Sequence, residues 1–336
     1  MKIIIPMAGM GKRMRPHTLV TPKPLITFAG KPMVHHIVEE LVKTCQEPVE
    51  EIAFITGDFG KEVESNLIDV AAQVGARGTI YHQQEPLGTA HAVLCAAPSL
   101  EGKLIVAFAD TLFKADFQLD EGMDSVIWVQ KVEDPKPFGV VKINQEGLIT
   151  DFVEKPQVFV SDLAIIGIYY FRDGKNLRAE LQHLIDNDIR EKGEYQITNA
   201  LENMQRKGLR FAPGQVNEWL DCGNRQATVE THRRWLKHFS DGDLQLDASI
   251  KQEDSTIIQP CIIGKNVEIR GSVIGPFVSI AENTRVENSV IKNSIIQKNS
   301  HIQNAVIMNS MVGSNVSVQL QALDLSLGDY STIQGS

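Results

Sequence analysis

The sequence predicts an α/β domain, built on a doubly wound and mostly parallel sheet, followed by a short parallel β-helix. Up to about residue 240, short β-branched runs alternate with helical stretches, as in βαβ units. Beyond a polar segment, aliphatic residues recur at steps of five or six. A chain of 336 residues is long enough for two domains. We therefore expect a first domain over 1–239, a linker over 240–256 and a β-helix domain over 257–336.

The β-rich runs of the first part are almost continuously apolar, which is typical of strands covered on both faces in a parallel sheet. Helices are predicted between them at 33–44 and 89–97, and a closing helix is predicted at 224–239. This alternation favours a sheet with helices packed on both faces. The predicted strands are 2–6, 51–56, 79–83, 104–110 and 125–130.

The spacing of the aliphatic residues in the last part fits neither a helix, with a period of about 3.6, nor a flat strand, with a period of about 2. In a β-helix each aliphatic side chain would point into a narrow prism, with Asn, Ser and Gly at the corners. The flat faces and open ends of such a prism favour packing between copies, so we expect a homo-oligomer. The repeating residues are Ile263, Ile269, Ile274, Ile280, Val286, Ile291, Ile296, Ile302, Ile307 and Val312.

The formal net charge of −9 argues against general binding to nucleic acids or to anionic membranes. No apolar run is long enough for a signal peptide or a membrane helix. The four cysteines are far apart in the sequence, which indicates neither a disulfide framework nor a zinc site. We therefore expect a cytoplasmic protein without a membrane partner or a nucleic-acid partner.

The stretch AGMGKRMRPHTLVTPKPL, residues 8–25, concentrates positive charge directly after the first predicted strand. It matches neither a P-loop nor a dinucleotide-binding fingerprint, because the required glycines and hydroxyl residue are missing. A solvated basic turn is the plain alternative. However, open α/β sheets bind ligands at the carboxyl ends of their strands, and two prolines hold Lys23 on a stiff segment. A polyphosphate would suit this loop, whose basic residues are Lys12, Arg13, Arg15 and Lys23.

The loop resembles the signature of the sugar-1-phosphate nucleotidylyltransferases, roughly G-x-G-T-R-x-x-P-x-T followed by P-K-P-L. Here it reads GMGKRMRPHT and then PKPL, with Lys12 where Thr is usual. The resemblance implies a Rossmann-like catalytic domain and, as in many members, a left-handed β-helix of hexapeptide repeats. Similar segments follow in the family's order: QQEPLGTAHAV (83–93), VAFADTLF (106–113), PFGVV (137–141), FVEKP (152–156), IIGIYYF (165–171) and WLDCGN (219–224).

The resemblance implies transfer of a nucleotidyl group from dTTP or UTP to a sugar-1-phosphate, with Mg²⁺ as cofactor and pyrophosphate as the second product. Glucose-1-phosphate is the first choice of acceptor, ahead of the mannose, galactose and amino-sugar phosphates. Ile165 stands where amino-sugar uridylyltransferases carry Asn, which disfavours N-acetylglucosamine-1-phosphate. The implied catalytic residues are Arg13, Lys23 and Lys155, and the implied metal ligands are Asp110 and Asp221. The implied nucleotide-binding residues are Ala8, Gly9, Gly11, Lys12, Gln83, Gly88 and Thr89, and the implied sugar-binding residues are Gly139, Glu154, Lys155 and Gly167.

Two alternatives stay open. One is an amino-sugar-1-phosphate uridylyltransferase or a bifunctional enzyme, which would carry a second, acyltransferase site in its β-helix, where His301 is the one histidine of the repeats. A non-catalytic sensor or regulatory subunit would keep the fold without the reaction. The presence of all five charged residues at the implied site argues against the sensor, because a protein without the reaction has no physical need for them. These residues are Arg13, Lys23, Asp110, Lys155 and Asp221.

Overall fold

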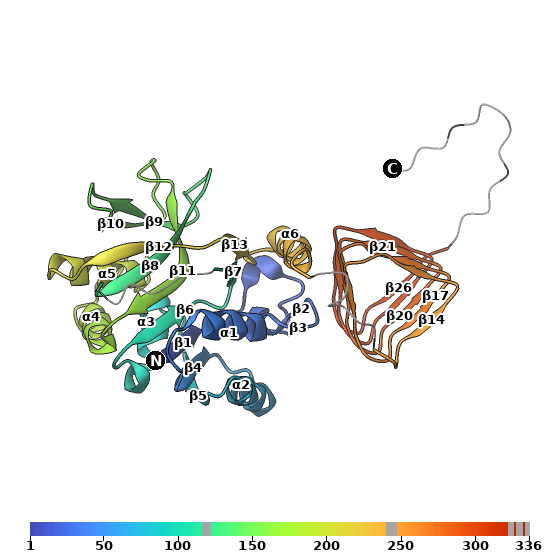
Figure 1. Ribbon diagram of the computed structural model, residues 1–336, viewed down its shortest axis with the longest axis horizontal. Helices are drawn as coiled ribbons and strands as arrows, with labels where there is room; N and C mark the ends of the chain where they lie inside the picture. Colours follow the sequence, from blue (N-terminus) through green and yellow to red (C-terminus); the bar gives the residue numbers. More distant parts are fainter. Residues whose placement is uncertain (116–121, 240–246, 322–325, 327–331, 333–336) are drawn as a thin grey trace. The chain divides into compact units, whose positions relative to one another are not determined.

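The computed structural model describes residues 1–115, 122–239 and 247–321, together with residues 326 and 332. The chain divides into two compact units (Figure 1). One unit comprises Met1–Thr27 and Lys31–Thr231, and the other begins at His232 and also takes in Phe28–Gly30. The predicted linker, 240–256, falls partly on residues 240–246, which lie outside the described residues.

The first unit is built on a sheet whose central strands are parallel. Strand β1 (Lys2–Pro6) pairs in parallel with β4 (Glu51–Thr56) and with β6 (Leu104–Ala107). Strand β4 pairs in turn with β5 (Arg77–His82). The side chains of β4 are all buried, in agreement with strands covered on both faces. The parallel core that the sequence predicts is therefore confirmed.

The other half of this sheet is antiparallel. Strand β11 (Leu163–Phe171) runs antiparallel to β6 and to β8 (Ser125–Lys131), although the run 125–130 was expected to join the parallel set. No helix separates β8 from β11 along the chain, whereas a parallel connection needs a crossover segment, usually a helix. The remaining strands here are β9 (Gly139–Ile143) and β10 (Ile149–Glu154), which pair antiparallel, and β12 (Phe211–Gln215), which is parallel to β8.

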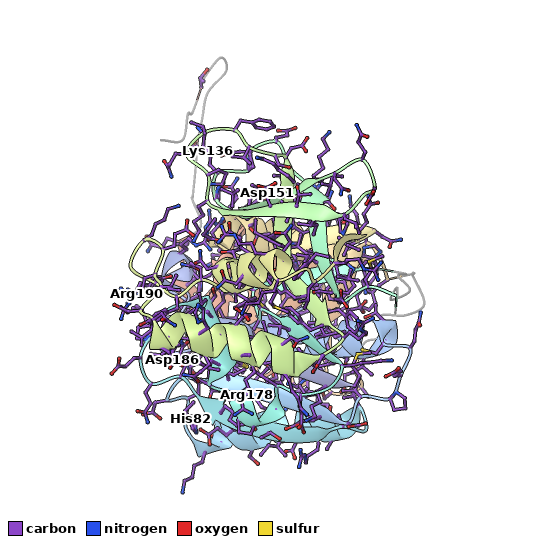
Figure 2. The ribbon with its side chains drawn as sticks, turned by 90° about the vertical axis from the view of Figure 1, so that its left-hand side faces the viewer. His82, Lys136, Asp151, Arg178, Asp186 and Arg190 are labelled. Carbon is purple, nitrogen blue, oxygen red and sulfur yellow. The ribbon has the colours of Figure 1, made fainter. Side chains whose placement is uncertain are left out.

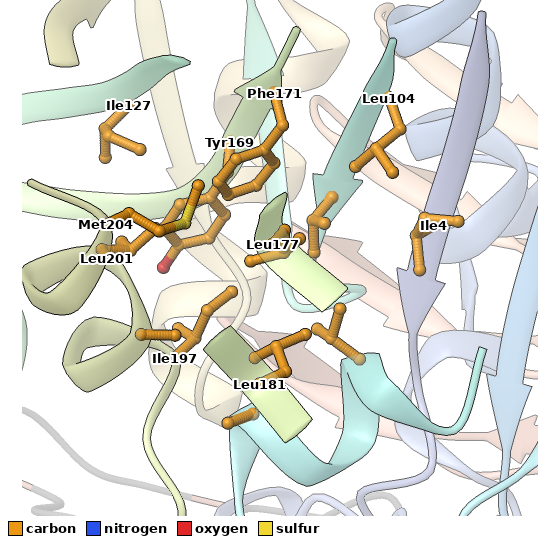
Figure 3. Close-up of a cluster of buried hydrophobic side chains, with 14 of the residues drawn as sticks. Ile4, Leu104, Ile127, Tyr169, Phe171, Leu177, Leu181, Ile197, Leu201 and Met204 are labelled. Atoms are coloured by element: carbon orange, nitrogen blue, oxygen red, sulfur yellow. The ribbon is translucent and has the colours of Figure 1, made fainter. Parts of the chain in front are cut away.

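Helices cover the sheet through apolar stripes. In α4 (Gly174–Asp186) the buried Leu177 and Leu181 are four residues apart, while Arg178 and Asp186 point outward (Figures 2 and 3). Together with residues of α3 and α5, they form one core against the strands, to which Tyr169 and Phe171 contribute their rings (Figure 3). The helices are α1 (Met33–Thr44), α2 (Lys61–Gln73), α3 (Thr89–Leu94), α4, α5 (Ile197–Arg206) and α6 (Arg225–Leu236).

Several short segments complete the described part of this region. The expected helix 89–97 ends at Leu94, and a 3-10 turn follows at Ala97–Ser99. Strand β7 (Thr111–Lys114) pairs antiparallel with β13 (Glu218–Asp221). Two short strands, β2 (Thr27–Phe28) and β3 (Lys31–Pro32), lie between the basic loop and α1. None of the described helices is both long and apolar enough to cross a membrane.

The second unit is a parallel β-helix, as predicted. Its strands stack into three parallel sheets, and aliphatic residues one coil apart are in register, such as Ile274 with Ile291 (Figure 1). The first sheet has β14 (Lys251–Glu253), β17 (Glu268–Arg270), β20 (Arg285–Glu287), β23 (His301–Gln303) and β26 (Ser317–Gln319). The second has β15 (Thr256–Ile257), β18 (Val273–Ile274), β21 (Val290–Lys292) and β24 (Val306–Met308). The third has β16 (Cys261–Ile263), β19 (Val278–Ile280), β22 (Ser294–Ile296) and β25 (Met311–Val312).

The asparagines of the repeats form corners between the sheets. Asn266, Asn283, Asn299 and Asn315 all adopt a positive φ near +56°, a conformation that Asn tolerates better than most residues. Each of the first three donates its side-chain Nδ2 to the Oδ1 of the next asparagine, at 3.1, 3.4 and 3.3 Å. Asn recurs in this part of the sequence for two reasons. It tolerates the positive φ of the corner, and its side chain hydrogen-bonds to the next coil.

Replacing Ile291 by Ala should destabilise the β-helix by about 2–5 kcal/mol, because its fully buried side chain fills the prism. The neighbouring Val290→Ala is the matched control, since Val290 points outward and is 41% exposed. Hydrogen exchange of peptides from residues 247–321 in the full chain would measure the stability of this unit alone. Equal loss of protection in both variants would contradict the inward placement of the repeat.

Candidate active site

A cleft lies at the carboxyl ends of the parallel strands, where open α/β sheets bind ligands. Its volume is about 390 Å³, and it is lined by the loop after β1, the loop after β5 and the turn after β6. Residues that the sequence analysis placed in three separate segments therefore meet at one site. The implied residues that line it are Ala8, Gly9, Gly11, Lys12, Arg13, Lys23, Gln83, Gly88, Thr89 and Asp110.

The basic loop is folded over the side chain of Lys23. Gly11 has a φ of +63°, and a Cβ added there would lie 2.8 Å from the Cβ of Lys23. The hydroxyl of Thr18 donates to the Gly11 carbonyl at 2.8 Å and closes the turn. The Lys23 side chain is only 6% exposed, and its Nζ lies 3.4 Å from Oδ2 of Asp110. Gly11 is thus required both by the backbone conformation and by the close approach of Lys23.

Two carboxylates lie close to the cationic loop, one in the turn after β6 and one on β13. Asp110 lies in the turn between β6 and β7 rather than at the end of a strand, and its carbonyl accepts the Cys222 N–H at 3.2 Å. The β7–β13 pairing brings Asp221 beside Thr111, and Asp221 Oδ1 accepts the Gly223 N–H at 2.8 Å. Two acidic residues that are 111 positions apart in sequence are thereby placed near each other.

The charges at this point are coupled. Burial raises the pKa of Asp221 above its ordinary value, and the negative charge of Asp110 raises it further. The Gly223 N–H and the positive charges of Lys23 and Arg13 act in the opposite direction. A cation bound close to Asp221 would offset the cost of its negative charge, since burial penalises an ionised carboxylate that lacks a partner.

The donor set fits Mg²⁺ bound together with substrate. No group of three or more His, Cys, Asp or Glu side chains that could hold a metal is found among the described residues. Asp110 and Asp221 would supply two hard oxygen ligands, and Mg²⁺ commonly takes one or two carboxylates and completes its shell with water and phosphate oxygens. The pair therefore suits a metal that arrives with a nucleotide better than a metal held by protein alone.

The segment 83–93 forms one wall of the cleft. Gln83 donates its Nε2 to the Gly88 carbonyl at 3.3 Å. Gly88 has a φ of +119°, and a Cβ there would meet the Tyr195 carbonyl oxygen at 2.5 Å, so only glycine fits. The Thr89 hydroxyl donates to Gln196 Oε1 at 3.1 Å and accepts the Ile197 N–H at 2.9 Å. Thr89 lines the cleft, but its hydroxyl holds the wall to the start of α5.

The residues implied in sugar binding gather beside the cleft and do not line it. Lys155 has a φ of +45°, and its Nζ lies 3.2 Å from Oε1 of the mostly buried Glu154. A Cβ on Gly139 would lie 3.0 Å from Glu154 Oε2, so these residues form one cluster. The Gly167 carbonyl on β11 accepts the N–H of Phe108. This hydrogen bond joins β11 to the turn that carries Asp110.

The loop before α5 belongs to the site, although the sequence did not indicate it. Lys192 donates its Nζ to the carbonyls of Glu154 and Lys155, each at 3.0 Å. Tyr195 donates its N–H to the Leu87 carbonyl at 2.8 Å, and Glu194 lines the cleft. The glycine at 193 signals a turn in the sequence, but no pattern there indicates contact with two distant segments.

Comparison with known proteins agrees with this arrangement. A family model described as nucleotidyl transferase matches residues 2–238. A glucose-1-phosphate thymidylyltransferase of Streptomyces antibioticus is 29% identical over 319 residues, which cover 88% of this chain and 87% of that protein. A mannose-1-phosphate guanylyltransferase catalytic subunit beta of Drosophila pseudoobscura pseudoobscura is 30% identical over 300 residues, covering 85% of this chain and 72% of that protein.

A solved structure shares the fold of about two thirds of this chain. It is a protein of Bacillus anthracis described as a glucose-1-phosphate thymidylyltransferase, in complex with sucrose, and it is 25% identical with a TM-score of 0.58. The similarity covers 68% of this chain and 92% of that one. Because the family model spans well over half of the sequence, the chain belongs to the nucleotidyl transferase family. It is an enzyme of the nucleotidyltransferase class, as the sequence analysis predicts.

Replacing Asp221 by Asn should stabilise the metal-free protein at neutral pH. The pKa of Asp221 is raised on folding, so this residue favours the fold below its ordinary pKa of 3.8 and loses that advantage as the pH rises through the folded pKa. The thermal midpoint in the presence of a chelator should therefore be higher in the variant at pH 7 than in the wild type, with the gap closing toward pH 4.

Asp151→Asn is the control for this experiment, because it removes an exposed carboxylate on β10 (Figure 2). Addition of Mg²⁺ should then raise the midpoint of the wild type more than that of Asp221→Asn. A variant that is less stable than the wild type at pH 7 without metal would contradict the electrostatic account of this residue.

Proposed function

We propose that the protein transfers a nucleotidyl group from dTTP or UTP to a sugar-1-phosphate, preferably glucose-1-phosphate, in a Mg²⁺-dependent reaction. The observation that carries the proposal is the cleft itself. Its cationic loop faces two carboxylates, and its opposite wall presents Gln83 beside the close backbone turn at Gly88. Such a site can neutralise a triphosphate and contact a base at the same time.

The proposed chemistry needs positioning more than proton transfer. A phosphate oxygen of the sugar-1-phosphate attacks the α-phosphorus of the nucleotide, and the bond from that phosphorus to the oxygen bridging the β-phosphorus breaks. The electron pair of the broken bond leaves with pyrophosphate. Because the nucleophile is already an anion, no side chain has to remove a proton, and the main barrier is the approach of two polyanions.

We assign the charged residues to the two ends of this reaction. Arg13 would bind the leaving pyrophosphate through its planar guanidinium, and Lys23 would stabilise charge at the α-phosphate. Lys155, paired with Glu154, would hold the incoming sugar phosphate. Asp110 and Asp221 would hold Mg²⁺, which when bound neutralises phosphate charge as a Lewis acid. The glycines of the loop would leave their backbone N–H groups open to phosphate oxygens.

The nucleotide and the sugar are the less constrained parts of the proposal. The similarity to a glucose-1-phosphate thymidylyltransferase supports dTTP and glucose-1-phosphate. A second candidate, GTP with mannose-1-phosphate, is favoured by the similarly distant guanylyltransferase relative. dTTP and UTP differ by one methyl group on the base and one 2′-hydroxyl on the sugar. The methyl group is worth only about 1–3 kcal/mol, so the two nucleotides would compete. Assembly into a homo-oligomer through the β-helix stays a prediction.

Pyrophosphate release in the presence of Mg²⁺ tests the proposal directly. The assay pairs dTTP, UTP, GTP, ATP and CTP with glucose-, mannose-, galactose- and N-acetylglucosamine-1-phosphate. We expect release with dTTP or UTP and glucose-1-phosphate. Release confined to GTP and mannose-1-phosphate would establish the second candidate. A folded protein that binds nucleotide and releases no pyrophosphate with any pair would favour the sensor.

Arg13→Ala should lower kcat by about two to three orders of magnitude, as expected for the loss of one charge-stabilising donor. Arg15→Ala is the matched control, because Arg15 belongs to the same basic loop but does not line the cleft. Both variants should keep the wild-type circular dichroism spectrum. Similar losses of kcat in the two variants would indicate a general effect of loop charge and would remove Arg13 from the assigned role.

A further inference from the structure

The side-chain amide of Gln83 is held in one orientation before any ligand binds. Its Nε2 lies 3.3 Å from the Gly88 carbonyl oxygen, which can only accept a hydrogen bond. The same Nε2 lies 3.1 Å from Nδ1 of His91. An amide NH₂ group carries two hydrogens, and these two neighbours occupy both of them. The amide oxygen is then the part of Gln83 that remains to meet a ligand in the cleft that Gln83 lines.

His91 is suited to the acceptor role in this arrangement. It is the third residue of α3, and its side chain is partly buried. Burial lowers the pKa of His91 below its ordinary value, which favours the neutral ring with a lone pair on one nitrogen. Because the amide nitrogen of Gln83 can only donate, Nδ1 of the neutral ring is the acceptor in this hydrogen bond.

We propose that His91 is a positioning residue that makes the cleft select nucleobases bearing a hydrogen on the ring nitrogen that faces Gln83. The inference rests on the proposed function of the cleft as a nucleotide site. Uracil and thymine carry N3–H, and guanine carries N1–H, so each can donate to a fixed amide oxygen. Cytosine and adenine present a lone pair at these positions and would face the same oxygen without a hydrogen bond.

The loss of the His91 acceptor would weaken this selection in a specific way. The Gly88 carbonyl alone would hold the amide through one long hydrogen bond, and Gln83 could then rotate to present its NH₂ group. The rotated amide would donate a hydrogen bond to N3 of cytosine. This bond would be equivalent to the one that the native amide oxygen accepts from N3–H of thymine. The variant should therefore lose affinity for thymine and gain affinity for cytosine, whereas a general loosening of the cleft would weaken both.

The test compares His91→Phe, which keeps a flat ring without an acceptor, with His91→Asn, whose Oδ1 can replace Nδ1. The matched nucleotide pairs are dTTP with 5-methyl-dCTP and UTP with CTP, and GTP with ATP covers the purines. Isothermal titration calorimetry gives the Kd ratio within each pair without requiring turnover, and pyrophosphate release gives the corresponding kcat/KM ratio. His91→Leu is a second acceptor-free variant, for use if the Phe variant does not fold.

Within each pair, we expect the wild type to prefer the nucleotide whose base carries the ring N–H. We expect His91→Phe to reduce the Kd ratio of the pair about tenfold or more. His91→Asn should restore most of the ratio. An unchanged ratio in His91→Phe and His91→Leu, or an equal loss in His91→Asn, would overturn the inference. A wild type without any preference within the pairs would also overturn it. Preserved base selection without pyrophosphate release would instead contradict the proposed function and leave the role of His91 supported.

Discussion

The contact between Lys23 and Asp110 is the interaction on which the rest of the cleft depends. An ammonium group that is almost completely withdrawn from water is costly unless an opposite charge or acceptors meet it. Asp110, in the turn after β6, supplies the opposite charge. The absence of a side chain at Gly11 leaves space for the Lys23 side chain. This one lysine therefore holds the loop after β1 to the turn between β6 and β7, where the cationic and acidic sides of the site meet.

The same contact explains how an acidic chain can maintain a site for anions. Lys23 and Arg13 partly compensate the mutual repulsion of Asp110 and Asp221, although the pKa of Asp221 remains raised. The site is thus short of positive charge near its carboxylates and rich in positive charge along its loop. A metal ion and a polyphosphate together would satisfy both regions, whereas either alone would leave one of them uncompensated.

The local parts of this design could be predicted from sequence. Strand β1, helix α1 and the aliphatic repeat depend on apolar periodicity within a few residues, and the structure places them where that periodicity indicates. The antiparallel half of the sheet could not be predicted in the same way, because β8 reads as one more buried strand until its partner β11 is known. Thr89 is a similar case: its position in the cleft followed from the motif, but its bonds to Gln196 and Ile197 depend on a segment about a hundred residues away.

The loop before α5 shows what such long-range contacts add to the site. Through Tyr195 it fixes the backbone of the Gln83–Gly88 wall, and through Lys192 it holds the carbonyls of Glu154 and Lys155. The wall assigned to the base and the cluster assigned to the sugar are therefore attached to the same short segment. The loop turns at two adjacent residues, since Lys192 has a φ of +54° and Gly193 a φ of +85°. Preorganisation of both substrate regions thus depends on a segment in which only Glu194 lines the cleft.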